Sequence, residues 1–254
     1  MKSKKILTAI LSLSAAAVMC FGMTACTDSG NNSSAADATS ATSAASAASA
    51  EEDDAAVKTG EFVITLHPEF APKTCENFEK LVKDGFYTNS SFHRIYPGFM
   101  AQGGQPAEGK EEASTIKGEF VENGVKTNTL SHVGAIVSMA RATDPDSANS
   151  QFFICFNDIA KENTDYLNGK YAAFGQVTEG MDVIDDLEKI DVQDNGAGEV
   201  SSPVKPVTIE KAEMIEDDKD GNHRAKFTIK YTPGSEKDSA SATDSSASSE
   251  ESSK

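Results

Sequence analysis

The sequence predicts a mainly β fold, a closed antiparallel β-barrel capped by two α-helices. Three observations support this fold class. Many short apolar runs are separated by Gly, Pro, Asn and Asp, only two stretches show a helical period, and both ends of the 254-residue chain are poor in core-forming residues. Short strands avoid exposed edges when their sheet closes on itself. We therefore expect one folded domain over residues 57–216, long enough to bury a substantial core.

The expected strands are short and bounded by turn residues. The first, residues 60–69 (GEFVITLHPE), alternates apolar and polar side chains, as a half-buried strand does. The strands expected after it cover residues 90–97, 99–104, 134–140, 150–156, 171–177 and 203–217.

Helical spacing occurs in two stretches. Residues 71–87 repeat apolar side chains every three to four positions, with Pro72 near the start and Gly85 near the end. Residues 180–190 (GMDVIDDLEKI) show the same period. We expect one helix in each stretch.

Two further segments lack such clear patterns. Residues 109–132 are polar and poor in strand-forming residues, which favours a long surface loop. We expect this loop to border the groove described below. Residues 217–234 extend beyond the expected domain. Their alternating segment 225–231 (AKFTIKY) is compatible with a further strand, to which the sequence assigns no role.

The N-terminus has the pattern of a bacterial lipoprotein signal peptide over residues 1–25. Positive charge in MKSKK precedes an apolar run that ends in Thr24-Ala25, directly before Cys26. We expect Cys26 to be lipidated and to anchor the mature protein at the extracytoplasmic face of the cell membrane. The alternatives are a transmembrane anchor, for which the run is short, and an unmodified secreted protein.

Low-complexity segments flank the expected domain. Residues 26–56, after the lipid-modified cysteine, and residues 235–254 are dominated by Ser, Ala, Thr, Asp and Glu, a composition that favours a disordered linker and a disordered acidic tail. A long linker of this kind suits a Gram-positive surface, and a periplasmic location is the alternative. The net charge of −17 argues against nucleic acid as a partner, and we expect a monomer.

Cysteine and histidine usage indicates no cofactor. After signal cleavage only Cys75 and Cys155 remain besides Cys26, each in an apolar setting, which favours buried free thiols over a disulfide. The four histidines lack metal-ligand spacing, so we expect no metal.

Residues 91–104 (SFHRIYPGFMAQGG) place one strong cation among aromatic and amide side chains. Strand alternation sends Phe92, Arg94 and Tyr96 to one face, and after the Pro97-Gly98 turn it aligns Met100 with Gln102.

The run 150–156 (SQFFICF) adds Gln151 and Phe153 on a single face by the same rule. An arginine and two glutamines would thus line a groove with the apolar side chains of Phe99, Met100 and Phe153. Such a groove suits a small, flat apolar ring flanked by peptide groups, a description that fits proline.

Four blocks of the sequence resemble a known family. FHRIYPGFMAQGG, SMARA, SQFFI and YLNGKYAAFGQVTEGMDVI are similar to successive signature blocks of the cyclophilins, which are peptidyl-prolyl cis-trans isomerases. The resemblance covers residues 58–216 in the family's order. It implies an eight-stranded antiparallel barrel closed by two helices, with the active site in a groove on its outer surface.

The resemblance also implies roles for individual residues. Arg94 matches the catalytic arginine, with Gln102 beside it. Tyr166 stands where animal cyclophilins carry Trp, Tyr171 replaces a histidine and Arg141 replaces a common Asn, departures that affect affinity more readily than the reaction. The implied proline pocket comprises Phe99, Met100, Phe153 and Leu167, and the peptide groove comprises Ala140, Arg141, Gln151, Tyr166 and Tyr171.

Two functions from different classes remain open. The first is a surface-tethered isomerase that accelerates rotation about X-Pro bonds in exported proteins. The second is a module that binds proline motifs, in which turnover is incidental. A purely structural role is the alternative for the residues assigned to the site. The apolar side chains could belong to the ordinary core, and surface carboxylates could hold Arg94 in a structural ion pair.

Overall fold

A computed structural model describes residues 56–235. The expected signal peptide, Cys26, nearly all of the linker and the acidic tail lie outside these residues. Within 56–235, no helix combines the length and apolar character needed to cross a membrane.

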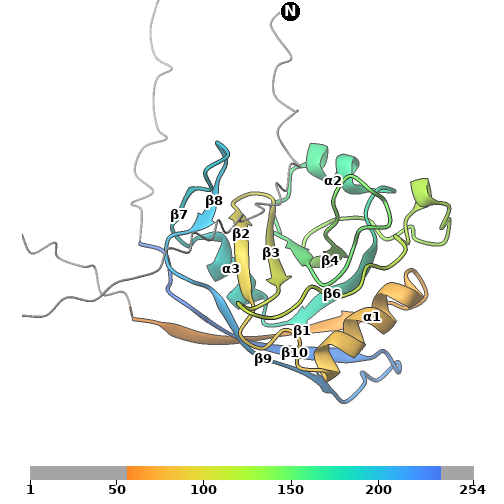
Figure 1. Ribbon diagram of the computed structural model, residues 1–254, viewed down its shortest axis with the longest axis horizontal. Coiled ribbons are helices and arrows are strands. Elements are labelled where there is room, and N and C mark those ends of the chain that lie inside the picture. Colours follow the sequence, from red (N-terminus) through yellow and green to blue (C-terminus); the bar gives the residue numbers. More distant parts are fainter. Residues whose placement is uncertain (1–55, 236–254) are drawn as a thin grey trace, which may run out of the picture. The chain divides into compact units, whose positions relative to one another are not determined.

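The described residues form a closed antiparallel barrel of eight strands (Figure 1). Around the barrel the strands follow the order β1-β10-β9-β2-β3-β5-β4-β6, so the expected fold class is confirmed. The barrel strands are β1 (Lys58–Leu66), β2 (Ser91–Tyr96), β3 (Met100–Gln105), β4 (Ile136–Met139), β5 (Phe152–Cys155), β6 (Ala173–Glu179), β9 (Thr208–Ile215) and β10 (Arg224–Tyr231).

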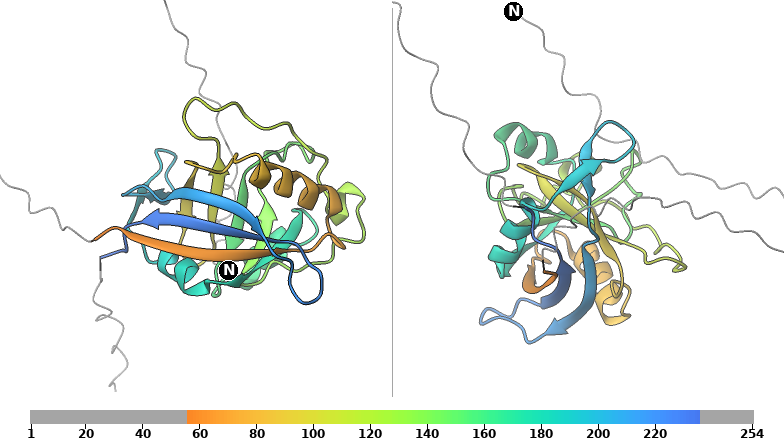
Figure 2. Two further views of the ribbon diagram at one scale, coloured as in Figure 1. Left: turned by 90° about the horizontal axis from the view of Figure 1, so that it is seen from below. Right: turned by 90° about the vertical axis from the view of Figure 1, so that its left-hand side faces the viewer.

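Strand β10 closes the barrel, although it belongs to the segment that the sequence placed outside the domain. It pairs with β1 along one edge and with β9 along the other, and Figure 2 shows the three strands side by side. Its alternate residues Ala225, Phe227, Ile229 and Tyr231 are buried. The barrel therefore extends to Tyr231, and the expected boundary at residue 216 separates its seventh strand from its eighth.

Three α-helices, one more than expected, accompany the barrel in the described part of the chain. The two expected helices are α1 (Pro72–Lys83) and α3 (Met181–Glu188). The additional helix, α2 (Lys161–Leu167), has seven residues and buries only Leu167, so it leaves no amphipathic repeat for the sequence to reveal.

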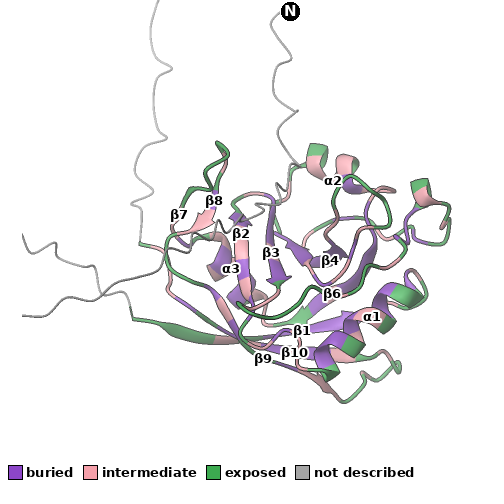
Figure 3. Ribbon diagram, viewed as in Figure 1, coloured by how far each residue is buried: buried purple, intermediate pink, exposed green. Residues whose placement is uncertain are grey.

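The barrel interior holds the main core, which Figure 3 shows as buried strand segments. Strand alternation divides β5 between two environments: Phe152 and Ile154 point into this core, whereas Phe153 and Cys155 belong to a separate apolar cluster on the other face. β3 is divided in the same way, with Ala101 in the core and Met100 in the separate cluster.

A β-bulge in β2 changes the expected alternation of its side chains. Phe92 pairs with Gly103 and Arg94 with the adjacent Gln102, so His93 is an extra residue in the ladder. Phe92 consequently points into the core together with Ile95, and the expectation that it shares a face with Arg94 is wrong. Gly103 permits this packing, because a Cβ there would lie 2.9 Å from the Phe92 ring.

A short hairpin outside the barrel, β7 (Val192–Asp194) and β8 (Val200–Pro203), was not expected from the sequence. Its two strands form their own two-stranded sheet, and β8 lies against β2. The hairpin therefore stands next to the strand that carries Arg94.

The segment 109–132 is largely irregular, as expected, and contains the short 3-10 helix Val121–Asn123. Several of its side chains are nonetheless buried. The Glu119 carboxylate accepts hydrogen bonds from the backbone N–H of Thr74 at 2.7 Å and from its hydroxyl at 2.8 Å, which caps the start of α1. Buried Glu119 thus fixes this loop to the start of α1.

Candidate active site

Six buried side chains form what we call the outer apolar cluster, on the face of β3 and β5 that points away from the barrel interior. It contains the whole proline pocket implied by the sequence, and Ala140 and Tyr166 pack against it from the side. Phe99 and Phe153 keep 6% and 5% of their surface exposed. The members of the cluster are Phe99, Met100, Phe153, Cys155, Leu167 and Tyr171.

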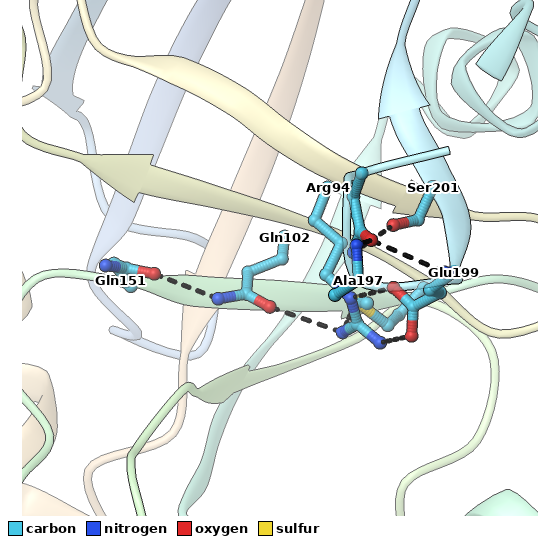
Figure 4. A network of polar contacts seen from close by, with 8 residues as sticks. Arg94, Gln102, Gln151, Ala197, Glu199 and Ser201 are labelled. Carbon is cyan, nitrogen blue, oxygen red and sulfur yellow. Dashed lines mark hydrogen bonds and ion pairs between the residues drawn. The ribbon is translucent and has the colours of Figure 1, made fainter. Parts of the chain in front are cut away.

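Arg94, Gln102 and Gln151 form a polar row beside this cluster (Figure 4). The Gln102 side-chain amide donates to Gln151 Oε1 at 2.9 Å, and Gln102 Oε1 accepts a hydrogen bond from Arg94 Nη1 at 3.4 Å. Arg94 Nη1 also lies 4.0 Å from the sulfur of Met100. The polar and apolar residues selected from the sequence therefore meet at one place, although the three polar ones come from β2, β3 and the residue before β5, and Leu167 comes from α2.

Glu199 is a further member of this site that sequence reasoning did not identify. Arg94 Nε donates to Glu199 Oε1 at 2.6 Å, and Arg94 Nη2 donates to Oε2 at 2.8 Å. Both side chains are partly shielded, with exposed fractions of 19% for Arg94 and 15% for Glu199. An ion pair between Arg94 and a carboxylate, which was the structural alternative for this arginine, is therefore present.

The geometry of this ion pair determines which donors Arg94 keeps. A guanidinium has five N–H bonds, and pairing through Nε and Nη2 consumes one on each of these atoms. The end-on edge, formed by Nη1 and the second hydrogen of Nη2, faces away from the carboxylate. Nη1, one of the two nitrogens of that edge, lies 4.0 Å from the Met100 sulfur and donates to Gln102 Oε1, so the edge borders the outer apolar cluster at Met100.

The turn between β7 and β8 fixes Glu199. Asn195 Oδ1 accepts hydrogen bonds from the backbone N–H of Ala197 and of Glu199, and Gly198 occupies the left-handed region with φ of 84°. The ion pair with Arg94, followed by a hydrogen bond from buried Ser201, lowers the pKa of the Glu199 carboxyl below its usual value despite partial burial. Glu199 is therefore ionised at neutral pH.

Arg141 lies at the other side of the cluster, where its guanidinium stacks on aromatic rings. Its Cζ is 4.6 Å from the centroid of the Tyr171 ring and 5.1 Å from that of Phe120, and its Nε donates to the Lys170 carbonyl at 3.0 Å. Burial raises the pKa of Tyr171 to about 12. Arg141 is thus committed to packing and to carbonyls, which distinguishes it from Arg94.

His132 supports the cluster from behind. Its ring stacks on Phe153 with the planes 18° apart, and its nitrogens lie 3.0 Å from Asn168 Oδ1 and 2.9 Å from Ser138 Oγ. Burial lowers the pKa of His132 to about 4, so the ring is neutral. The sequence offered no signal for this contact, because His132 ends a polar loop segment.

The two described cysteines are free and buried, as the sequence favoured. Burial raises the pKa of each thiol to about 12, so neither is a nucleophile at neutral pH. Residues 56–235 contain no group of three His, Cys, Asp or Glu side chains arranged to hold a metal ion.

Comparison with known proteins identifies a family over most of the described residues. The family model described as cyclophilin type peptidyl-prolyl cis-trans isomerase/CLD matches residues 54–214. A peptidyl-prolyl cis-trans isomerase-like 1 from Gibberella zeae is 39% identical over 160 residues, which are 63% of this chain and 91% of that protein. A probable peptidyl-prolyl cis-trans isomerase from Brucella suis biovar 1 is 35% identical over 161 residues, 61% of this chain and 80% of the relative.

Among solved structures, a Cryptosporidium parvum cyclophilin type peptidyl-prolyl cis-trans isomerase, crystallised in the presence of the dipeptide Ala-Pro, has a TM-score of 0.47 and 28% sequence identity. The match covers 60% of this chain and 96% of that one. The family model and the curated relatives, which agree with the barrel and with the residues gathered on its outer face, show that this chain belongs to the cyclophilin-type peptidyl-prolyl cis-trans isomerase family.

Proposed function

We propose that the outer apolar cluster and the polar row form an active site that accelerates rotation about X-Pro peptide bonds. The observation that carries this proposal is the end-on edge of Arg94, whose Nη1 lies beside Met100 and Gln102. A proline ring held against Phe99, Phe153 and Leu167 would bring its nitrogen within reach of that edge.

The chemistry of the X-Pro bond explains why an arginine suits this task. Rotation is slow because the proline nitrogen shares its lone pair with the carbonyl, which gives a barrier of about 18–20 kcal/mol. At the half-turned transition state the lone pair returns to the nitrogen. A fixed N–H donor directed at this atom therefore binds the transition state more tightly than either ground state.

Arg94 supplies only part of the acceleration. A charge-assisted hydrogen bond contributes about 1.5–3 kcal/mol, which corresponds to a factor of about 10 to 150 in rate. The remainder comes from capture of the ring by the apolar cluster and from hydrogen bonds to the flanking peptide groups. We assign these contacts to Gln102 and Gln151, with Ala140, Arg141, Tyr166 and Tyr171 along the rest of the peptide groove. The rotation needs no nucleophile, proton transfer or cofactor.

The test is a protease-coupled assay of a proline peptide with the wild-type protein and Arg94→Ala. We expect kcat/KM to fall by about 10- to 150-fold. Arg224→Ala is the matched control, since Arg224 also pairs with a carboxylate, that of Glu179 at 2.8 Å, but lies on β10, which pairs with β1 and β9 and not with the strands of the site. Equal rates for the wild-type protein and Arg94→Ala would contradict the assignment.

We further propose that the enzyme acts on exported proteins at the cell surface, attached through a lipid on Cys26. The support is sequence pattern alone: an apolar leader, a cysteine after Thr24-Ala25, and a long Ser/Ala-rich spacer. Cys26→Ser should release the protein from membranes into the medium, as measured by fractionation and immunoblotting. Continued membrane attachment of this variant would count against lipidation.

A further inference from the structure

We propose that Glu199 is a positioning residue for the isomerase reaction, which holds the Arg94 guanidinium so that its end-on edge faces the proline site. This inference rests on the proposed role of Arg94. It assigns a function to the β7–β8 hairpin, which carries Glu199 against β2.

The ion pair has the geometry of a positioning contact. Nε lies 2.6 Å from Glu199 Oε1 and Nη2 lies 2.8 Å from Oε2, so two parallel hydrogen bonds fix both the place and the plane of the guanidinium. A carboxylate that blocked the site would pair with the end-on edge instead. Here that edge keeps Nη1, at 4.0 Å from the sulfur of Met100 and 3.4 Å from Gln102 Oε1.

Arg94 needs such a partner because the rest of its surroundings hold it weakly. The long arginine side chain has several rotatable bonds and loses much rotamer freedom when it is ordered. Its contact with Gln102 is long for a hydrogen bond, and its Cζ is 6.0 Å from the centre of the Tyr96 ring. The two short bonds to Glu199 are therefore the principal restraint on the guanidinium.

Glu199 is itself held before any peptide binds. Ser201, which is fully buried, donates a hydrogen bond to the carboxylate, and Asn195 fixes the turn through the backbone N–H of Glu199 at 3.4 Å. Figure 4 shows Glu199, Arg94, Gln102 and Gln151 joined in that order by hydrogen bonds, with Ser201 on the hairpin side of the row. The hairpin thus extends the polar row by one charged member.

The negative charge of Glu199 is compatible with the reaction. The proline nitrogen at the transition state is an uncharged acceptor, so it requires a directed N–H bond and not a net positive charge. The ion pair with Glu199 offsets the net charge of Arg94 but leaves its N–H bonds in place. It therefore removes little of the stabilisation of the transition state. The pair would also disfavour capture of Arg94 by acidic side chains of a substrate.

The experiment measures peptide affinity and the rate of cis-trans exchange separately, by NMR titration and exchange spectroscopy of a proline peptide with the full-length purified protein. For Glu199→Ala we expect kcat/KM to fall about 10-fold while the peptide dissociation constant changes less than about 2-fold. Glu199→Gln keeps the shape and one acceptor, so we expect an intermediate loss and an intact fold. Glu179→Gln, which breaks the Arg224 pair, is the control and should match the wild type.

A double-mutant cycle decides whether Glu199 acts through Arg94. In the Arg94→Ala background, Glu199→Ala should cause no further loss of activity. An equal loss in that background would overturn the proposal, because the hairpin would then act by another route. Unchanged or higher activity of Glu199→Ala in the wild-type background would also overturn it, and higher activity would make the carboxylate a competitor of the substrate. An inactive wild-type protein, or an Arg94→Ala variant as active as the wild type, would instead remove the proposed function itself.

Discussion

Arg94 illustrates how the surroundings of one residue select its chemistry. The same guanidinium has a side-on edge that pairs with Glu199, while its Nη1 lies beside Met100 and Gln102. Arg141, only a few ångströms above the Tyr171 ring, is instead used for stacking and for binding carbonyls. Residue type alone does not separate these two arginines, whereas their partners do.

The sequence predicted the members of the site whose position follows from strand alternation. Met100 and Gln102 share one face of β3, and Gln151 and Phe153 share one face at β5, because side chains along a strand alternate between its two faces. Pairing of the two strands brings these faces together. Glu199 could not be found this way, since it lies 105 residues beyond Arg94 in a turn without apolar pattern. Contacts between distant loops depend on the folded topology, which the local sequence does not contain.

His132 gives a pH-dependent prediction at the same scale. Its folded-state pKa of about 4 is below the ordinary value near 6.5, so between these values the unfolded chain binds a proton that the folded chain excludes. The contribution of His132 to stability is complete above about pH 6.5 and declines as the pH falls toward 4, by on the order of 3 kcal/mol. Urea unfolding of His132→Gln should show a smaller loss of stability between pH 7 and pH 5 than the wild type.

His223 provides a control of opposite sign. It is exposed, and the neighbouring Glu79 carboxylate raises its pKa, so its contribution is present below pH 6.5 and is lost as the pH rises through the folded-state pKa. His223→Gln should leave the loss between pH 7 and pH 5 at least as large as in the wild type. An identical pH profile for the wild type and His132→Gln would contradict the role of the buried ring.

At the scale of elements, β10 shows where sequence periodicity was sufficient and where it was not. The alternation of residues 225–231 indicated a strand, and the structure confirms one. Its pairing with β9 joins consecutive strands, but its pairing with β1 was not predictable, because β1 lies more than 150 residues earlier and such pairing depends on which barrel edge remains open. The bulge in β2 is a similar case, since one extra residue reversed the expected direction of Phe92.

Removal of β10 should therefore open the barrel. A chain that ends at residue 221 loses the buried side chains of Ala225, Phe227, Ile229 and Tyr231 and exposes the edges of both β1 and β9. We expect this chain to lack a cooperative thermal transition. A chain that ends at residue 235 keeps all eight strands and should unfold cooperatively.

The outcome would be read by circular dichroism, with the longer truncation as the matched control. Cooperative unfolding of the chain that ends at 221, at a midpoint equal to that of the longer chain, would contradict the assignment of β10 to the barrel.

At the scale of the whole described molecule, the barrel uses the two faces of β3 and β5 for different purposes. Inward residues such as Ala101 and Ile154 build the main core, while Met100 and Phe153 on the opposite face build the outer apolar cluster. The strands that carry the site are thus fixed by the core behind them. A reaction that depends on orientation, with no cofactor to supply reactivity, benefits from such a rigid support.

The family match ends at residue 214, yet the closed barrel requires β10. A chain designed from the family boundaries alone would therefore omit one strand in eight. The proposed site lies on β2, β3, β5, α2 and the β7–β8 hairpin, all before this strand. The hydrogen bonds of Arg94 and Gln102 involve no residue of β10, so we expect the site to depend on β10 through the stability of the barrel.

The central claim is that the site turns X-Pro bonds over and does not merely hold them. Exchange spectroscopy of a proline peptide with catalytic amounts of protein measures this directly, because peptide binding and cis-trans exchange are seen in the same spectra. We predict that the wild-type protein accelerates exchange and that Arg94→Ala slows it by about 10- to 150-fold while still shifting the peptide resonances. Wild-type protein that shifts those resonances without accelerating exchange would contradict the account and identify a proline-binding module instead.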